Sequence, residues 1–255
     1  MSQMTITTAK QFDYSKVPAV TGVFWLAKLI TTGMGESVSD ALSSIISKPA
    51  TLLVSLIAFA ILLVTQMRTD RYRPQLYWPT VATLAIAGTA LADETHDGLG
   101  IGYPVSVAIY LIAMIVTMVA WYRTEHGISI HSIFTPRREA FYWLTVVFSF
   151  TLGTAAGDWF ADGLGLGFLG TAIALGVPML ASMGMNGFSK KWEVATFWFA
   201  YILTRPVGAS IADYCGYGTP NLGNEMMSLI WIALFIPVLA YLIIKDRHQT
   251  TLSEE

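Results

Sequence analysis

The stretch YWLTVVFSFTLGTAAGD, residues 142–158, contains the pattern that decides the fold: an aromatic–Trp pair, then Gly after nine residues and Asp after four more. The same spacing occurs three more times without insertion or deletion, at residues 24–40, 77–93 and 197–213. Each copy lies in an apolar stretch long enough to cross a bilayer, which takes about 20 residues. A fixed spacing that recurs in this way indicates internal repeats, so we expect four copies of one helical unit.

The composition is typical of a polytopic membrane protein. Of the 255 residues, 54% are hydrophobic and only 13% are charged, whereas a soluble domain is about one quarter charged. The sequence contains no phosphate-binding loop, no His-Glu-x-x-His and no Gly-x-Ser-x-Gly motif. We therefore expect neither ATP hydrolysis nor standard hydrolase chemistry, and no catalytic residue is proposed.

Eight apolar segments are predicted to cross the membrane as α-helices, at approximately residues 18–45, 49–67, 76–96, 101–122, 140–161, 165–185, 193–214 and 225–244. Twelve of the fifteen basic residues precede the first segment or follow an even-numbered one: Lys10, Lys16, Arg68, Arg71, Arg73, Arg123, Arg137, Arg138, Lys190, Lys191, Lys245 and Arg247. By the positive-inside rule, both termini face the cytoplasm. The expected fold is a single all-α membrane domain over residues 1–255, located in the bacterial inner membrane.

Each repeat is thus an outward helix followed by a returning helix, at approximately residues 16–67, 68–122, 137–188 and 190–245. All four repeats have the same orientation, which predicts a pseudo-symmetry axis along the membrane normal instead of an inverted repeat. The polar segment 124–136 is expected to be a cytoplasmic linker between the two halves of the chain. The second and third repeats share an Asp-x-x-x-Asp-Gly-Leu-Gly element that the first and fourth lack.

Residues three, seven, eleven and fifteen positions after each Trp form one stripe along the predicted helix. With Trp at the cytoplasmic interface, the Asp at the end of the stripe lies about 22 Å into the membrane. The Trp residues themselves are expected to form an aromatic belt at that interface. The polar members of the stripes, which we expect to line an ion pathway, are Thr32, Glu36, Asp40, Thr89, Asp93, Thr154, Asp158, Arg205 and Asp213.

The motif allows two interpretations. In one, it packs helices: each copy contains a small-x-x-x-small pair, a pattern that lets helix backbones approach closely in lipid. The pairs are Gly35/Ser39, Gly88/Ala92, Gly153/Gly157 and Gly208/Ala212. In the other, the four aspartates converge on a shared polar cavity, because ionisable groups in membrane helices usually face a partner, a cavity or a permeation path.

Arg205 and Glu36 lie near the middle of the membrane on the same stripe of the last and first repeats. A lone charge at that depth is costly, so we expect Arg205 to contact Glu36, with Asp40 or Asp213 as alternative partners. The contact is either a structural ion pair or a gate or proton-linked switch.

Two neighbouring features carry further expectations. Pro206 directly follows Arg205, which predicts a kink in that helix and freed carbonyl groups. Lys28 lies nearer the cytoplasmic edge, where its long side chain is expected to extend to the interface.

Candidate metal ligands gather at the outer helix ends of the two middle repeats. They are Asp93, His96 and Asp97 in the second repeat and Asp158 and Asp162 in the third. Carboxylates with one imidazole suit Mn²⁺, and carboxylates alone suit Ca²⁺ or Mg²⁺. Because Asp-Gly at a helix end is also ordinary turn chemistry, a structural role for these residues stays open.

Several motifs resemble those of a known family. They are K-x-P-x-V-T-x-x-F-W at residues 16–25, G-E-x-x-x-D at 35–40, S-I-H-S-I at 129–133 and R-R-E-A-F-Y-W at 137–143. Nearly the whole chain resembles a bacterial family of four-repeat integral membrane proteins known chiefly as a repeat of unknown function. The resemblance implies four repeats and no particular substrate.

The favoured hypothesis is that the protein is a small inner-membrane transporter of a cation, with the repeat aspartates lining its pathway. The cation is a divalent metal ion, or its transport is coupled to protons. The alternative is a non-transporting scaffold or regulatory protein whose motif only packs helices. The expected partners are the lipid bilayer and a small inorganic ion, and no nucleic acid. The only cofactor considered is a bound divalent cation, and self-association stays open.

Overall fold

The computed structural model describes residues 15–186 and 192–254, so Lys10, Lys190 and Lys191 lie outside the described residues. The prediction of an all-helical chain is confirmed, because these residues form eight α-helices and no strand. The helices are α1 (Gly22–Ile46), α2 (Lys48–Met67), α3 (Pro74–Asp93), α4 (Tyr103–Glu125), α5 (Pro136–Asp158), α6 (Gly167–Asn186), α7 (Glu193–Tyr217) and α8 (Asn224–Glu254).

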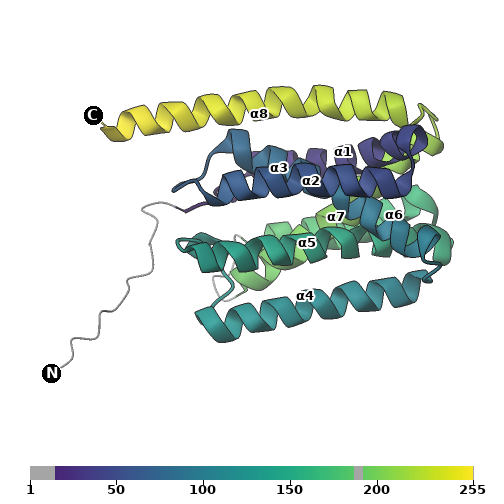
Figure 1. Cartoon of the computed structure of the whole chain (residues 1–255), viewed down its shortest axis with the longest axis horizontal. Helices are drawn as coiled ribbons and strands as arrows, with labels where there is room; N and C mark the ends of the chain where they lie inside the picture. The colour runs from purple at the N-terminus through teal and green to yellow at the C-terminus, as the bar shows by residue number, and fades with distance from the viewer. Residues whose placement is uncertain (1–14, 187–191, 255) are drawn as a thin grey trace.

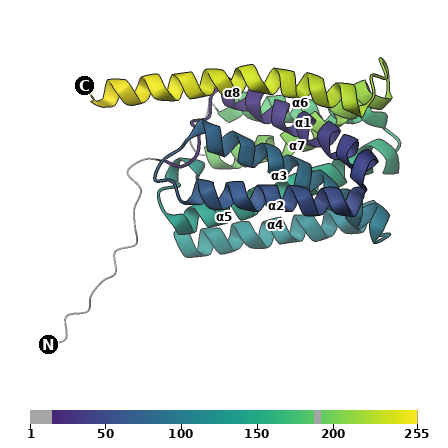
Figure 2. The same ribbon diagram turned by 45° about the horizontal axis from the view of Figure 1, so that its top comes forward.

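The helices lie side by side and alternate in direction (Figures 1 and 2). The α2–α3 and α4–α5 connections and the C-terminal end of α8 lie at one end, on the left of Figure 1. We call it the basic end, because the arginines at positions 68, 71, 73, 137 and 138 belong to it. The opposite end holds the C-terminal ends of α1, α3, α5 and α7, which carry the repeat aspartates, and we call it the acidic end.

The odd-numbered helices form a closed inner ring in which α1 contacts α3, α3 contacts α5, α5 contacts α7 and α7 contacts α1. The even-numbered helices surround this ring. Each packs mainly on the inner helix of the following repeat: α2 on α3, α4 on α5, α6 on α7, and α8 on α1. The four repeats are therefore interleaved, and the last repeat closes on the first.

Apolar side chains cover the outside of this bundle, and charged and hydroxyl side chains are buried in its centre beside an apolar core. Leu53 and Ile61 on α2 and Leu229 on α8 are each more than 60% exposed, whereas Arg205 and Glu36 are buried. In the described part of the chain, five helices are long and apolar enough to cross a membrane: α2, α4, α5 extended to Gly163, α6 and α8. This distribution is the reverse of that in a soluble protein and fits a chain surrounded by lipid.

An aromatic layer fills the ring near the basic end. The aromatic residue before each Trp packs on the Trp of the following repeat, and the fourth packs on the first. The ring-centroid distances are 5.9 Å for Phe24–Trp78, 5.5 Å for Tyr77–Trp143, 6.3 Å for Tyr142–Trp198 and 5.7 Å for Phe197–Trp25.

The prediction that the Trp residues form a belt facing the interface is wrong, since all four are at most 8% exposed. Their position on the helix faces the neighbouring inner helices, where a large ring buries more apolar surface than at the lipid boundary. Two of the indoles also find a polar partner inside the protein: Trp78 Nε1 donates to the Tyr72 hydroxyl at 2.9 Å, and Trp198 Nε1 to the Ile128 carbonyl at 2.9 Å.

A glycine layer lies in the middle of the ring. The motif Gly of each repeat packs on the residue seven positions after the Trp in the following repeat. A Cβ added at the glycine would overlap or crowd that residue, in the pairs Gly35–Ala85, Gly88–Phe150, Gly153–Arg205 and Gly208–Thr32. The prediction that the motif glycines allow close helix approach is confirmed, and the four contacts repeat around the ring.

This packing makes a prediction for Gly208. A Cβ at this position would collide with the Thr32 side chain and would lie 3.1 Å from the Gly33 nitrogen, so it cannot be accommodated without moving α1 away from α7. Gly208→Ala should destabilise the protein by about 1–3 kcal/mol, measured as a lower Tm in detergent.

The matched control is Gly184→Ala on α6, where a Cβ would meet no atom within 4 Å. It should leave stability unchanged or raise it by up to about 1 kcal/mol, because Ala favours helix more than Gly does. Equal Tm values for the two variants would contradict the glycine ring.

Candidate functional site

The four repeat aspartates meet at one pocket at the acidic end of the inner ring. Its volume is about 390 Å³. Carboxylates predominate in its lining, together with a few aromatic and hydroxyl groups and one lysine: Glu36, Asp40, Ser43, Ser44, Lys48, Asp93, Tyr103, Asp158, Asp162, Phe168, Asp213 and Tyr217. The close approach at the glycine layer brings the ends of α1, α3, α5 and α7 to the same level, which places all four aspartates around this pocket.

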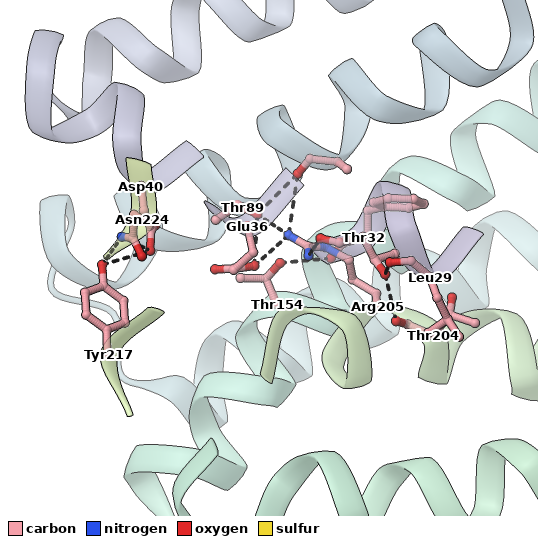
Figure 3. Close-up of polar contacts among 12 residues, drawn as sticks. Leu29, Thr32, Glu36, Asp40, Thr89, Thr154, Thr204, Arg205, Tyr217 and Asn224 are labelled. Atoms are coloured by element: carbon pink, nitrogen blue, oxygen red, sulfur yellow. Dashed lines mark hydrogen bonds and ion pairs between the residues drawn. The ribbon is translucent and has the colours of Figure 1, made fainter. Parts of the chain in front are cut away.

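Arg205, which is 1% exposed, lies behind Glu36 of the pocket lining. Its Nη2 lies 2.9 Å from Glu36 Oε2 and also donates a hydrogen bond to Thr89 Oγ1 (Figure 3). Its Nη1 donates to the Thr32 carbonyl at 2.8 Å. The predicted contact between Arg205 and Glu36 is confirmed, and the guanidinium joins α7 to both α1 and α3.

Hydrogen bonds among the neighbouring side chains hold this layer together. The Thr89 hydroxyl donates to Glu36 Oε2 at 3.2 Å, so the carboxylate contacts α3 as well as Arg205. The Thr32 hydroxyl lies 2.8 Å from the Leu29 carbonyl and 3.1 Å from the Thr204 carbonyl (Figure 3). Thr154 is buried beside this group and bonds to its own helix, with its hydroxyl 3.4 Å from the Phe150 carbonyl.

Gly153 makes room for Arg205 and for the following Pro206. A Cβ at Gly153 would lie 2.6 Å from the Arg205 Cβ and 3.0 Å from the Pro206 Cδ. The α7 helix continues through Pro206 from Glu193 to Tyr217. Its Thr204 carbonyl is among those near the proline, and it accepts the Thr32 hydroxyl from α1. This hydrogen bond joins α7 to α1 beside the proline.

The aspartates differ in how their oxygens are occupied. Asp40 Oδ2 accepts hydrogen bonds from the Tyr217 hydroxyl at 3.1 Å and from Asn224 Nδ2 at 3.0 Å (Figure 3). Asp213 is only 7% exposed and has no hydrogen bond or ion pair to any described residue. A buried carboxylate without a partner is unfavourable, so Asp213 is the acid most in need of a ligand.

Oxygens of Glu36, Asp40 and Asp213 lie within 4.8 Å of one another. That separation allows one hard cation to contact all three carboxylates at the usual distances of about 2.1–2.6 Å. Among the residues that the structure describes, this is the group of three or more potential metal ligands that is close enough to share an ion.

The structure does not bring the five predicted metal ligands together. Asp93, Asp158 and Asp162 line the pocket, whereas Asp97 forms an ion pair with Lys48. The His96 ring stacks on Tyr103 at 3.7 Å, with its Nδ1 3.0 Å from the Ile101 carbonyl.

Other partners draw His96 and Asp97 away from the aspartates: the ring of Tyr103 for His96 and the amine of Lys48 for Asp97. Both residues lie in a π-helical turn, Glu94–Gly98, that follows Asp93, and a second such turn, Trp159–Gly163, follows Asp158 and contains Asp162. The wider hydrogen bonding of these turns, such as Leu99 N to the Glu94 carbonyl at 2.9 Å, interrupts the α-helical register. The element shared by the second and third repeats in the sequence corresponds to these two turns.

A buried ion pair at the basic end was not predicted from the sequence. Lys16 forms an ion pair with Glu139 at the start of α5, and both side chains are at most 1% exposed. Lys16 Nζ also donates to the Met67 carbonyl at 3.0 Å, so it ties the segment before α1 to the ends of α2 and α5. Both residues belong to motifs of the resembled family, but no spacing in the sequence indicates their contact.

The prediction that Lys28 extends to the interface is wrong. Its side chain is 1% exposed, and its Nζ lies 3.5 Å from the centre of the Phe150 ring and 3.9 Å from that of Tyr201. The aromatic layer lies between Lys28 and the basic end of the ring, so the amine cannot reach water there. Aromatic faces attract it instead.

Comparison with known proteins agrees with the repeat architecture. The family described as Repeat of Unknown Function (DUF347) matches four segments, residues 23–72, 76–126, 141–191 and 196–248. Each segment contains one inner and one outer helix. No curated protein and no solved structure matches the chain. Because the four matches together cover most of the sequence, the chain belongs to the DUF347 repeat family.

Proposed function

We propose that this protein is a small inner-membrane transporter of a cation and that the pocket at the acidic end is its binding site. The observation that carries the proposal is that the motif aspartates of all four repeats, together with Glu36, line one pocket. Six carboxylates and one lysine lie in its wall. A pocket with this excess of negative groups attracts cations and disfavours anions.

The chemistry of the lining favours a hard cation. Oxygen ligands without sulfur or imidazole suit Mg²⁺, Ca²⁺ and Mn²⁺. Glu36, Asp40 and Asp213 supply such oxygens within 4.8 Å of one another. Asp213 is independent evidence for a bound cation, because it is buried and no described side chain forms a hydrogen bond or ion pair with it.

Arg205 acts as the inner gate in this proposal. Its guanidinium lies 2.9 Å from the Glu36 carboxylate, on the side of Glu36 toward the middle of the ring. A cation that binds Glu36 competes with Arg205 for the same oxygens, so occupancy of the pocket weakens the contact that closes it. The chain contains no ATP-binding motif, so transport is passive or coupled to another ion.

The proposal places eight helices across the inner membrane, with the basic end in the cytoplasm. The inner helices α1, α3 and α7 are the less apolar ones because their polar stripes face the ring, and the outer helices shield them from lipid. The arginines at the α2–α3 and α4–α5 connections set this orientation by the positive-inside rule.

Reporter fusions test this topology. Fusions after Arg73, after Pro136 and at the C-terminus should all be active as cytoplasmic reporters, and a fusion after Gly100 should be active only as a periplasmic one. A periplasmic C-terminus would refute the eight-span arrangement.

A non-transporting scaffold is the competing function, and the glycine and aromatic layers favour it for part of the motif. Those layers account for the Gly and Trp positions by packing alone. They do not account for the aspartates, because Asp213 forms no hydrogen bond or ion pair with a described side chain that would hold helices together. The two functions therefore differ in what the aspartates do.

The Asp213→Asn variant separates the two functions. It keeps the size of the side chain and removes the charge, so a cation-binding site should be lost while the fold persists. In proteoliposomes, Mn²⁺ flux should fall at least about tenfold. In detergent, the stabilisation by Mn²⁺, about 2.7 kcal/mol at one hundred times Kd, should disappear.

Glu225→Gln is the matched control, because Glu225 is an exposed acid at the start of α8 that does not line the pocket. It should transport and bind like the wild type. If Asp213→Asn instead lowers the folding yield, and no divalent cation raises the Tm of the wild type, the scaffold is the better description.

Removing Arg205 from its ion pair with Glu36 should lower the stability of the protein. Arg205→Ala leaves the Glu36 carboxylate buried without its cation, which should lower stability by about 3–5 kcal/mol. Adding Glu36→Gln should recover a large part of the loss, since a neutral amide requires no counter-ion. Thermal denaturation of both single variants and the double variant measures the coupling. A double variant no more stable than Arg205→Ala would mean that Arg205 pairs chiefly with another acid.

A further inference from the structure

Lys28 is the one basic side chain of the inner ring for which the structure shows no acid and no hydrogen-bond acceptor among the described residues. Its Nζ is buried and unsatisfied, whereas Arg205, one layer nearer the pocket, has an acid and three further oxygens as partners. Cation–π contact with Phe150 and Tyr201 is its attractive interaction. A side chain of this kind in the centre of a membrane protein is costly unless it has a function.

The groups shown in contact with Lys28 come from two helices. α7 presents Tyr201, and the Cζ of its Arg205 lies 5.9 Å from the centre of the same Phe150 ring that Lys28 contacts. α5 presents Phe150 itself. Val81 on α3 and Val146 on α5 are buried apolar residues at the stripe position that Lys28 occupies in α1.

Further charged and titratable groups lie one layer away on either side. On its own helix, the nearest acid is Glu36, two turns along and already bound to Arg205. Toward the basic end, the hydroxyls of Tyr77 and Tyr142 share a hydrogen bond of 2.5 Å. Lys28 therefore has a second positive charge beside the ring that it contacts and no negative charge of its own.

This environment accepts the side chain in either protonation state. The faces of two aromatic rings attract an ammonium group, and the apolar neighbours suit a neutral amine. The free-energy difference between protonated and neutral Lys28 then depends on the charges nearby. Of these, the charge at the pocket is the one that changes when a cation binds. With the pocket empty, Glu36 neutralises Arg205. A cation in the pocket shares the Glu36 carboxylate and adds positive charge on the far side of Arg205.

We propose that Lys28 is the proton-exchanging residue of this transporter: it carries a proton while the pocket is empty and releases it when a cation binds Glu36 and Asp213. The N–H bond breaks with its electron pair left on Nζ, and bulk water takes up the proton. Because the coupling is reciprocal, a protonated Lys28 weakens cation binding, and cation and proton exchange for one another. The inference rests on the proposed function and names its coupling ion.

The test counts protons released when Mn²⁺ binds to the full-length protein in detergent. Calorimetric titrations in buffers of different ionisation enthalpy give this number at each pH. Lys28→Met has a side chain of similar length that carries no proton, so it should release about one proton fewer per Mn²⁺ than the wild type, and its Mn²⁺ affinity should depend less on pH. Lys245→Met, on an exposed lysine of α8, is the matched control and should behave as the wild type.

Lys28→Arg provides a second, independent variant, because a guanidinium keeps its proton at all accessible pH values. It should also lack the Lys28-dependent proton release, and its Mn²⁺ affinity should be about tenfold weaker than that of Lys28→Met. Lys28→Met removes the positive charge and Lys28→Arg fixes it, so the two variants together separate the effect of the charge from the effect of side-chain packing. If one of them folds poorly, the other still tests the proton release.

Two negative results have different meanings. Mn²⁺ binding with the same proton count in the wild type and in either folded Lys28 variant would overturn the inference and leave the proposed cation site intact. A wild-type protein that binds no Mn²⁺ would overturn the cation site and the inference together.

Discussion

The close approach of the four inner helices at their motif glycines is the constraint on which the rest of the structure depends. Because each glycine lacks a Cβ, its helix can approach the next one closely, and each glycine packs on the same stripe position of the following repeat. Because the fourth contact returns to the first helix, the ring closes. A closed ring at this level brings four aspartates that are 53 to 65 residues apart in the sequence to one pocket.

The layers of the ring have different physical roles. Near the basic end, aromatic rings interlock and leave Trp25, Trp78, Trp143 and Trp198 almost without exposed surface. In the middle, glycines bring the backbones together around one guanidinium and its carboxylate. At the acidic end the side chains stay short and charged, and the ring opens into a pocket. Packing therefore closes one end of the molecule, and repulsion among acids together with small side chains keeps the other end open.

The packing contacts are the same in all four repeats, whereas the charged residues differ between them. The aromatic and glycine contacts have the same form four times, whereas the charges between the aromatic layer and the aspartates come from the first and last repeats. Lys28 and Glu36 lie on α1 and Arg205 lies on α7. At those three levels the second and third repeats have valine, threonine, and alanine or phenylalanine, and their aspartates are followed by the two π-helical turns. A duplicated scaffold of this kind allows single positions to change their chemistry, because the helix contacts that hold the ring do not depend on them.

Much of the architecture could be predicted from residue pattern alone. The span ends, the alternating direction of the helices and the four repeats follow from apolar length, basic loops and a fixed spacing, all of which are local. The contact between Arg205 and Glu36 was also predictable, because two opposite charges at one depth in a low-dielectric medium have few other solutions.

Other features depended on which neighbour each side chain meets. The stripe rule placed the Trp residues and Lys28 at the right level along the bundle, but it could not tell that neighbouring helices would enclose both, because an outward-facing and a ring-facing position at one level have similar sequences. Likewise, the sequence grouped His96 and Asp97 with the aspartates as metal ligands, whereas in the structure Asp97 pairs with Lys48 and His96 stacks on Tyr103. The sequence by itself thus determined the elements, their order and the level of each charge along the bundle. Only the tertiary structure decided which charges are paired, since pairing depends on contacts between helices that are distant in the chain.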